Sequence, residues 1–400
     1  MTNNWQWVKI ADVQDPKGKA IVSGPFGSNI GMRFFVSEGI PVIRGNNLTT
    51  DLTRFIDNGF VFLTEEKAQE FKNCEAIPGD LIFTAAGSLG QVGLIPDNPK
   101  FPKYIISNKQ LRARLDSTKV DKLFAFYWLS SPSMVEYIQQ QNTGSSVPLI
   151  NLSILRALPI PLPSLPEQRA IAEVLGALDD KIELNRRMNA TLEAMARAVF
   201  REWFVDNPEA EGWEIGTVGD IAQNIRRSTT PNNIDPDTPY IGLEHMPRGS
   251  IALIEWGNAN ELESNKFRFN KGEFLFGKLR PYFHKVGIAP LDGVCSTDIL
   301  VITPKSPVWY GLVLGYISSV ELINYTNAAS TGTKMPRTSW QDIARYEIPI
   351  PPKKLAKEYS EILLPLTQQI NINIEQSRTL AELRDTLLPR LMRGEVRVKI

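Results

Sequence analysis

The feature that most constrains the fold is an internal repeat, because segments from the first half of this 400-residue chain recur in the same order in the second half. The matching segments, first copy before second, are WQWVKIADV and GWEIGTVGDI, IPVIRGNNL and TPYIGLEHM, PGDLIFTAAGSLGQVGLI and KGEFLFGKLRPYFHKVGIA, NTGSSVP and STGTKMP, and LPIPLP and EIPIPP. A spacing of about 190 residues is too long for a solenoid, whose repeats span roughly 20 to 50 residues. The sequence therefore predicts a duplicated module.

Each copy begins with a globular segment of mostly β character. Short runs rich in β-branched and aromatic residues, bounded by Gly, Pro and Asp, predict strands. These runs are PVIRG, GDLIFTA, VGLI, EFLFGK, VGIA and DILVIT. Residues 122–141 and 308–326 are apolar enough to predict helices that pack on those strands. The pattern indicates an α+β chain with two similar α/β domains.

A long helix is predicted after each globular segment. LPIPLPSLPEQ closes the first copy, and the chain then runs from Glu167 to Asn207 without a proline. Within 166–206 apolar residues are spaced alternately four and three positions apart, which is the period of a coiled-coil seam. The first seam comprises Ile171, Leu175, Leu178, Ile182, Asn185, Asn189, Leu192, Ala196, Val199 and Trp203. The second comprises Tyr359, Leu363, Leu366, Ile370, Asn373, Ser377, Leu380, Arg384, Leu387 and Leu391.

The polar seam positions predict how the two helices meet. If a pseudo-twofold axis relates the copies, Asn185 faces Ser377 and Asn189 faces Asn373, which gives one polar layer in an antiparallel coiled coil. A parallel pair would instead place Asn185 beside Asn373. The other expected pairs are Ile182–Leu380, Leu192–Ile370, Leu175–Leu387, Val199–Leu363, Trp203–Tyr359 and Leu178–Arg384. Arg384 is the mismatch, and we expect its side chain to extend to solvent.

Composition and motifs argue against a self-sufficient enzyme. The two cysteines are far apart and no stretch approaches twenty apolar residues, so we expect a cytoplasmic protein without a membrane span. The chain lacks a G-x-x-x-x-G-K-[ST] loop, the H-E-x-x-H and G-x-S-x-G signatures, and the Asn/Asp-Pro-Pro-aromatic tetrapeptide of amino-methyltransferases. Neither His245 nor His284 lies in a metal-ligand pattern, so we expect no metal and no cofactor on this chain.

The remaining chemistry lies in polar loops that recur in both copies. Arginine with asparagine or glutamine suits the edges of guanine and adenine, which favours DNA contact. The net charge of zero, from 44 basic and 44 acidic residues, weakens this interpretation without excluding it. The candidate DNA contacts are Arg44, Lys109, Arg112, Arg226, Arg227, Lys278 and Arg280. Surface solubility is the competing explanation for any one of them.

Three segments resemble one known family. LPIPLPSLPEQRAIAEVLGALDDKIELNRRMNATLEAMARAVFREWF, at 158–204, is similar to the central conserved region of the specificity (HsdS) subunits of type I restriction–modification systems. TLLPRLMRGEVRV, at 386–398, resembles their closing segment. The T-G-x-x-x-P sequences from Thr143 to Pro148 and from Thr331 to Pro336 resemble the ends of their recognition domains. The second helix departs from the pattern, because PPKKLAKEYSEIL lacks the Pro-Glu-Gln of the first.

The resemblance implies an architecture. It implies target-recognition domains at 1–152 and 209–340, a central long helix at 153–208 and a distal one at 341–400. Each recognition domain would read one half of a split, asymmetric site in double-stranded DNA. The two helices would form the antiparallel coiled coil that sets the spacing of the halves.

The resemblance also implies partners and a division of chemistry. The chain would be non-catalytic and would dock two methyltransferase subunits, which use S-adenosylmethionine to methylate adenine. Restriction subunits with ATP and Mg would cleave the DNA. Two other classes stay open at this point. One is a coiled-coil adaptor that binds only proteins, and the other is a diverged DNA methyltransferase or nuclease.

Overall fold

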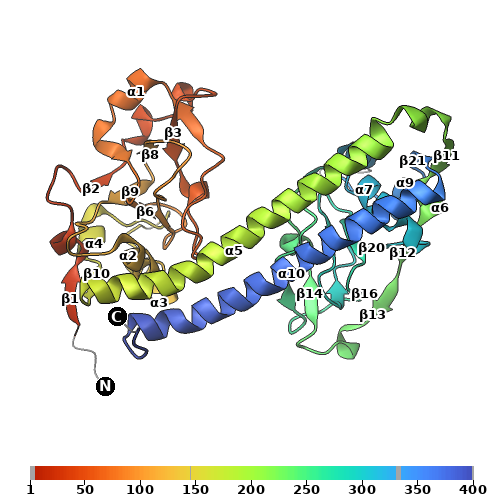
Figure 1. Cartoon of the computed structure of the whole chain (residues 1–400). Coiled ribbons are helices and arrows are strands. Elements are labelled where there is room, and N and C mark those ends of the chain that lie inside the picture. The colour runs from red at the N-terminus through yellow and green to blue at the C-terminus, as the bar shows by residue number, and fades with distance from the viewer. Residues whose placement is uncertain (1–4, 145, 330–334, 399–400) are drawn as a thin grey trace. The chain divides into compact units, whose positions relative to one another are not determined.

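The chain contains two compact units, each built from a head of strands and short helices and from parts of two long helices. The computed structural model describes residues 5–144, 146–329 and 335–398, so the Thr143–Pro148 and Thr331–Pro336 motifs lie partly outside it. Unit 1 comprises residues 1–180 and 380–400, and unit 2 comprises residues 181–379. Figure 1 shows the chain coloured from its N-terminus to its C-terminus.

The head of unit 1 holds two four-stranded sheets and a separate strand pair. The first sheet, in spatial order, is β2 (Ile21–Ser23), β9 (Gln110–Ala113), β6 (Leu81–Thr84) and β7 (Val92–Leu94). The second is β4 (Val61–Leu63), β3 (Ile40–Ile43), β8 (Tyr104–Ile106) and β5 (Glu75–Ala76). The pair is β1 (Gln6–Lys9) with β10 (Pro159–Leu162). The short helices are α1 (Glu65–Gln69), α2 (Lys122–Leu129), α3 (Pro132–Gln140) and α4 (Leu152–Ala157).

The head of unit 2 repeats this topology, with one additional strand in its second sheet. Its first sheet is β12 (Ala222–Ile225), β20 (Ile299–Pro304), β17 (Phe274–Gly277) and β18 (Val286–Ile288). Its second is β13 (Arg227–Thr229), β16 (Lys266–Phe269), β19 (Gly293–Cys295), β14 (Pro239–Ile241) and β15 (Gly257–Asn258). The strand pair is β11 (Glu214–Thr217) with β21 (Glu347–Ile350). The short helices are α6 (Val218–Ile221), α7 (Tyr310–Ile317), α8 (Val320–Ala329) and α9 (Trp340–Ala344).

Equivalent strands in the two heads are buried on both faces, which shows the duplication at the level of side chains. In β6, Leu81 and Phe83 enter the core that contains α2, whereas Ile82 enters a second core on the opposite face. In β17, Phe274 and Phe276 enter the core that contains α7, whereas Leu275 faces a second core. Side chains alternate between the faces of a strand, so continuous apolar runs fit strands that are covered on both sides. The predicted duplicated α/β module is confirmed.

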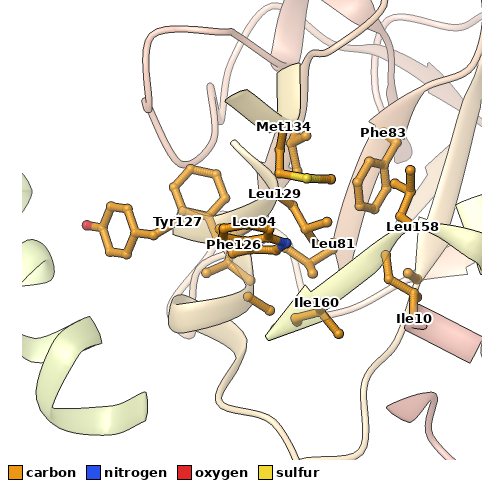
Figure 2. Packing of buried hydrophobic residues seen from close by; sticks show 14 of the residues in the cluster. Ile10, Leu81, Phe83, Leu94, Phe126, Tyr127, Leu129, Met134, Leu158 and Ile160 are labelled. Atoms are coloured by element: carbon orange, nitrogen blue, oxygen red, sulfur yellow. The ribbon is translucent and has the colours of Figure 1, made fainter. Parts of the chain in front are cut away.

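The α2 core is the largest of the three hydrophobic clusters described in unit 1. Figure 2 shows Phe126, Leu129 and Met134 packing beside Leu81 and Phe83. The hydroxyl of Tyr127 points away from the other labelled side chains in Figure 2. The same cluster includes Ile171 and Leu175 from the first long helix and Leu388 and Leu391 from the second. The ends of the long helices are therefore part of the head's own core.

The two long helices begin and end close to the positions predicted for them. Helix α5 spans Leu165–Phe200 and continues into a π-helical turn at Arg201–Val205, while α10 spans Lys353–Met392. Gln168 fixes the start of α5, since its buried side chain accepts from the Asp121 amide and donates to the carbonyls of Lys119 and Pro163. All twenty predicted seam positions are buried or half-buried.

The contacts between the helices are antiparallel, as predicted. In unit 2, Asn185 Nδ2 donates to Ser377 Oγ at 3.2 Å, and Asn373 Nδ2 donates to Asn189 Oδ1 at 2.8 Å. The ring of Trp203 lies 6.2 Å from that of Tyr359 between centroids, which also matches the predicted pair.

The expectation that Arg384 would extend to solvent is wrong. Its side chain is 10% exposed and pairs with Asp179 at 2.7 Å in unit 1. Its guanidinium also contacts Asp385 at 2.8 Å. Arg384 remains in the seam because a carboxylate one residue beyond Leu178 compensates the charge that the seam would otherwise bury alone.

Candidate nucleic-acid interface

In unit 1 the exposed candidate residues follow two adjacent parallel strands. β3 and β8 pair in parallel through Val42 with Ile105 and through Ile43 with Ile106. Arg44 comes directly after β3 and Lys109 shortly after β8, and both are exposed. Because the carboxyl ends of neighbouring parallel strands share one edge of a sheet, both cations lie at the same edge. This edge is the candidate nucleic-acid surface of unit 1.

The loop after β3 is held by a single buried amide. Asn47 is fully buried, and its Oδ1 accepts from the backbone amide of Arg44 at 2.9 Å. Its Nδ2 donates to the carbonyls of Ile56 and Asn58 at 2.9 and 2.8 Å. A fully bonded buried amide fixes local backbone geometry. Asn47 therefore sets the backbone position from which the exposed Arg44 side chain leaves the sheet.

Arg112, also predicted as a DNA contact, lies inside the head instead. Its residue is 3% exposed, and its guanidinium donates to the carbonyls of Glu75 and Lys19. Burial lowers its pKa, and Asp80, which Arg114 holds through two hydrogen bonds, lies 4.0 Å away. Arg112 alternates along β9 with residues that face the α2 core, and the opposite face is covered as well. This placement corrects the prediction and indicates a structural role.

In unit 2 the two consecutive arginines differ in their partners. Arg227 forms a bidentate ion pair with Glu273, with N–O distances of 2.8 and 2.7 Å, and this pairing raises its pKa. Arg226 is exposed and lies over the ring of Phe267, 5.6 Å from its centroid. A guanidinium held by a carboxylate has its parallel donors occupied. Arg226 is thus the better placed of the two to bind an external acceptor.

Lys278 belongs to a cluster of charges around Asp298. Its backbone amide donates to the Asp298 carbonyl at 2.8 Å, and burial lowers the pKa of its ammonium. Arg337 pairs with the Asp298 carboxylate at 3.0 Å. In unit 1 the matching backbone bond runs from Ala85 to the carbonyl of Lys109, at 2.7 Å. The two heads therefore hold opposite charges at one equivalent position, Lys109 in unit 1 and Asp298 in unit 2.

Arg280, the last candidate, lies in the segment KLRPYFHK, which forms the loop between β17 and β18. Tyr282 is 50% exposed, and its ring lies 4.7 Å from that of Phe283. The guanidinium of Arg248, from another loop, lies 3.8 Å above the Phe283 ring. The aromatic residues of KLRPYFHK are visible in the sequence, but nothing in it places Arg248 beside them.

Each head is anchored to its own stretch of the long helices. In unit 1, Arg54 donates to Asp180 and to the Gly176 carbonyl of α5 at 2.8 and 3.0 Å, while Tyr127 donates to Asp179 at 2.5 Å. In unit 2, Glu193 of α5 is 3% exposed and accepts from the Ser250 hydroxyl at 2.6 Å. These contacts make each head rigid with respect to the helical segments in its own unit.

Within the described ranges, no group of three or more His, Cys, Asp or Glu side chains could hold a metal ion. None of the helices in those ranges carries an apolar stretch that would span a bilayer.

Comparison with known proteins finds similarity to specificity subunits of type I restriction enzymes. The model of the type I restriction modification DNA specificity domain family matches residues 2–194 and 210–383. The MjaIX specificity subunit of a type I restriction enzyme from Methanocaldococcus jannaschii is 25% identical, over 99% of this chain and 94% of that protein. The HindI specificity subunit from Haemophilus influenzae is 29% identical, over 86% and 94%. The crystal structure of the S subunit of a type I restriction–modification system from M. genitalium has the same fold, with a TM-score of 0.61, 17% identity, and coverage of 100% of this chain and 98% of that one.

Proposed function

The chain belongs to the type I restriction modification DNA specificity domain family, and we propose that it is the sequence-reading subunit of a type I restriction–modification complex. The observation that carries this proposal is the duplicated head, because each head has its own set of polar loops. Two heads with different loop chemistry in one chain suit a DNA site made of two unlike halves. We assign the reading heads to residues 1–152 and 209–340, and the spacer to 153–208 and 341–400.

The partners follow from this role. The chain would hold two methyltransferase subunits and the restriction subunits on double-stranded DNA in the cytoplasm, without catalysing either reaction. S-adenosylmethionine, ATP and Mg would bind to those partners. Phosphate neutralisation supplies most of the non-specific affinity for DNA. With a net charge of zero, the isolated chain should bind DNA weakly, and its partners should supply much of the grip on the phosphates.

The test is to express the chain with its methyltransferase subunits and to map methylated adenines in the host DNA. We expect one bipartite, asymmetric motif. Exchange of residues 1–152 for the equivalent segment of a relative should change only one half of it. A change in both halves would contradict independent reading heads.

The same preparation separates the two other classes of function. A protein-only adaptor would leave the host DNA without a defined methylated motif when its partners are present. Methylation or cleavage of DNA by the purified chain alone would indicate an enzyme.

A further inference from the structure

One loop is built on the same backbone frame in the two heads but carries different chemistry. It spans residues 85–91 between β6 and β7 in unit 1, and residues 278–285 between β17 and β18 in unit 2. The amide of Gly87 donates to the Pro148 carbonyl at 2.9 Å, and that of Arg280 donates to the Pro336 carbonyl at 2.8 Å. The bridge of Ala86 with Leu149 likewise matches that of Leu279 with Arg337. The two loops can therefore be compared position by position.

Two positions in this frame need a left-handed backbone, and unit 2 fills neither with glycine. In unit 1 they are Gly87 and Gly90, with φ of 101° and 92°. In unit 2 they are Arg280 and His284, with φ of 52° and 50°. Such a backbone strains residues that have a Cβ, and strained residues cluster at functional sites. Because glycine forms this backbone conformation without strain in unit 1, the side chains of Arg280 and His284 have a role other than forming the loop.

His284 anchors the loop. Its Nε2 lies 2.9 Å from the carbonyl oxygen of Ser318, directly after α7, so Nε2 carries the proton and donates. Its own carbonyl accepts from the amide of Gly249 at 2.9 Å. These bonds join the loop to the end of one helix and to a neighbouring loop. His284 is therefore a positioning residue.

Arg280 offers a cation without a carboxylate partner among the residues that the structure describes. Its residue is half-buried, and its guanidinium carbon lies 5.9 Å from the centroid of the Phe283 ring. Both terminal nitrogens of Arg227, by contrast, donate to Glu273. The Nε of Arg280 is buried without a hydrogen-bond partner among the described residues, and the terminal nitrogens of a planar guanidinium match the O6 and N7 acceptors of guanine.

The unit 2 loop is one residue longer than the unit 1 loop, and Tyr282 lies in its middle. It is half-exposed at the tip, against Phe283, whose ring is approached by the cations of Arg248 and Lys285 at 3.8 and 5.9 Å. The unit 1 loop has Ser88 and Leu89 at its tip and carries neither an aromatic nor a charged side chain. An aromatic tip surrounded by cations suits a groove lined with phosphates, where the ring can pack against bases.

We infer that the 278–285 loop contacts base pairs for unit 2, with Arg280 donating to a guanine edge and Tyr282 setting the sequence preference beside it. The unit 1 loop lacks these groups, so unit 1 reads its half-site through other residues. The inference rests on the proposed DNA-reading function and names the residues that determine specificity in one head.

The test uses the full chain with its methyltransferase subunits and compares Arg280→Gly, Tyr282→Ala and Arg345→Ala. Glycine is the residue that unit 1 carries at the Arg280 position, so Arg280→Gly should unfold at a temperature equal to or above that of the unsubstituted protein. Arg345 is exposed and pairs with Asp342 on α9, so its substitution controls for the loss of one positive charge. Methylated adenines are mapped, and binding is measured on duplexes that differ by single base pairs.

We expect Arg280→Gly to relax a single guanine position in one half of the motif, with discrimination falling about tenfold or more. Tyr282→Ala should relax an adjacent position, and Arg345→Ala should leave the motif unchanged. Uniformly weaker binding with an unchanged motif would show that Arg280 contacts phosphate and would overturn the inference. An unchanged motif at full affinity would overturn it as well. If the unsubstituted complex methylates no defined sequence, the proposed function itself fails.

Discussion

Where the head of unit 1 meets the long helices, a buried network of charged and phenolic groups lies beside the apolar core that they share. In unit 2 a group of packed aromatic rings takes the place of that network. The repeat aligns Arg384 with Ala196 and Tyr127 with Gly315. In unit 1 these two large side chains both bind Asp179. In unit 2 their small counterparts leave room for Phe200, which packs against Tyr316 and Tyr359 with ring centroids 5.1 and 6.1 Å away.

Gly315 shows why the aromatic junction needs a small residue. A Cβ at this position would lie 2.2 Å from Cδ2 of Phe200, so any larger residue would displace the ring. Beside the rings is a cavity of about 410 Å³, lined by Ala196, Phe200, Gly315 and Tyr359 among others. The equivalent contact between head and long helices is thus made by polar side chains in unit 1 and by aromatic rings in unit 2. The polar network demands defined directions, whereas the aromatic stack depends mainly on buried area.

The largest effect should come from breaking the charged network of unit 1. Arg384→Ala leaves Asp179 buried without its closest cation, which should lower the free energy of unfolding of unit 1 by about 3 kcal/mol. Urea unfolding, followed by hydrogen exchange in peptides from each head, measures where stability is lost. The matched control is the double change Asp179→Leu with Arg384→Leu, which removes both charges and should cost far less. A loss below about 1 kcal/mol for Arg384→Ala would contradict a buried, coupled pair.

A smaller effect should follow from removing one hydroxyl in each unit. Tyr127 donates to the Asp179 carboxylate at 2.5 Å, whereas Tyr359 donates to the neutral carbonyl of Ala196 at 3.2 Å. Bonds to charged acceptors are the stronger ones, so Tyr127→Phe should cost about 2 kcal/mol and Tyr359→Phe about 1 kcal/mol. Thermal or urea unfolding of the two variants measures the difference. Equal losses would show that the charge on Asp179 contributes little.

The stability of Tyr127→Phe should also differ from that of the unsubstituted protein in its dependence on alkaline pH. Burial, together with the negative charge of Asp179, raises the pKa of Tyr127, so its phenol stays protonated in the folded state while the unfolded residue ionises near pH 10. The stability that this shift provides is complete below about pH 10 and is lost as pH rises further. Tyr127→Phe should flatten this alkaline decline in unit 1.

The helices and their register could be predicted from the sequence, because a seam period repeats over many turns and polar seam residues match only in one orientation. The ion pair of Arg384 with Asp179 could not be predicted, because Asp179 lies outside the seam and no local pattern identifies it as a partner. The prediction that Arg112 contacts DNA was wrong for a related reason. A strand that is covered on both faces buries odd-numbered and even-numbered positions alike. From the sequence alone, a single polar residue in such a strand is easily assigned to a solvent-exposed face.

The recognition loops were only partly predictable. Their residue types were visible, and Lys278 and Arg280 lie in the loop that the structure singles out. Neither arginine nor histidine signals a left-handed backbone, so the strain at Arg280 and His284 emerges only from the structure. Arg248 reaches Phe283 from a separate loop, and contacts of that kind depend on tertiary packing that no local pattern encodes.

The smallest effect on stability should come from changing the polar layer between the long helices of unit 2. These variants test whether the layer stabilises the helices or specifies how they pair. Asn373 Nδ2 bonds to Asn189 Oδ1, while Asn185 Oδ1 is buried without a hydrogen-bond partner among the described residues. Asn189→Leu with Asn373→Leu exchanges a bonded pair for apolar contact, so the free energy of unfolding should change by no more than about 1 kcal/mol and can increase. Asn373→Leu alone should cost more, because it leaves the Oδ1 of Asn189 without its donor. If the layer fixes register, the double variant should also exchange amide hydrogens faster near these positions in α5 and α10. Unchanged exchange together with a large loss of stability would show that the layer stabilises the helices and does not specify how they pair.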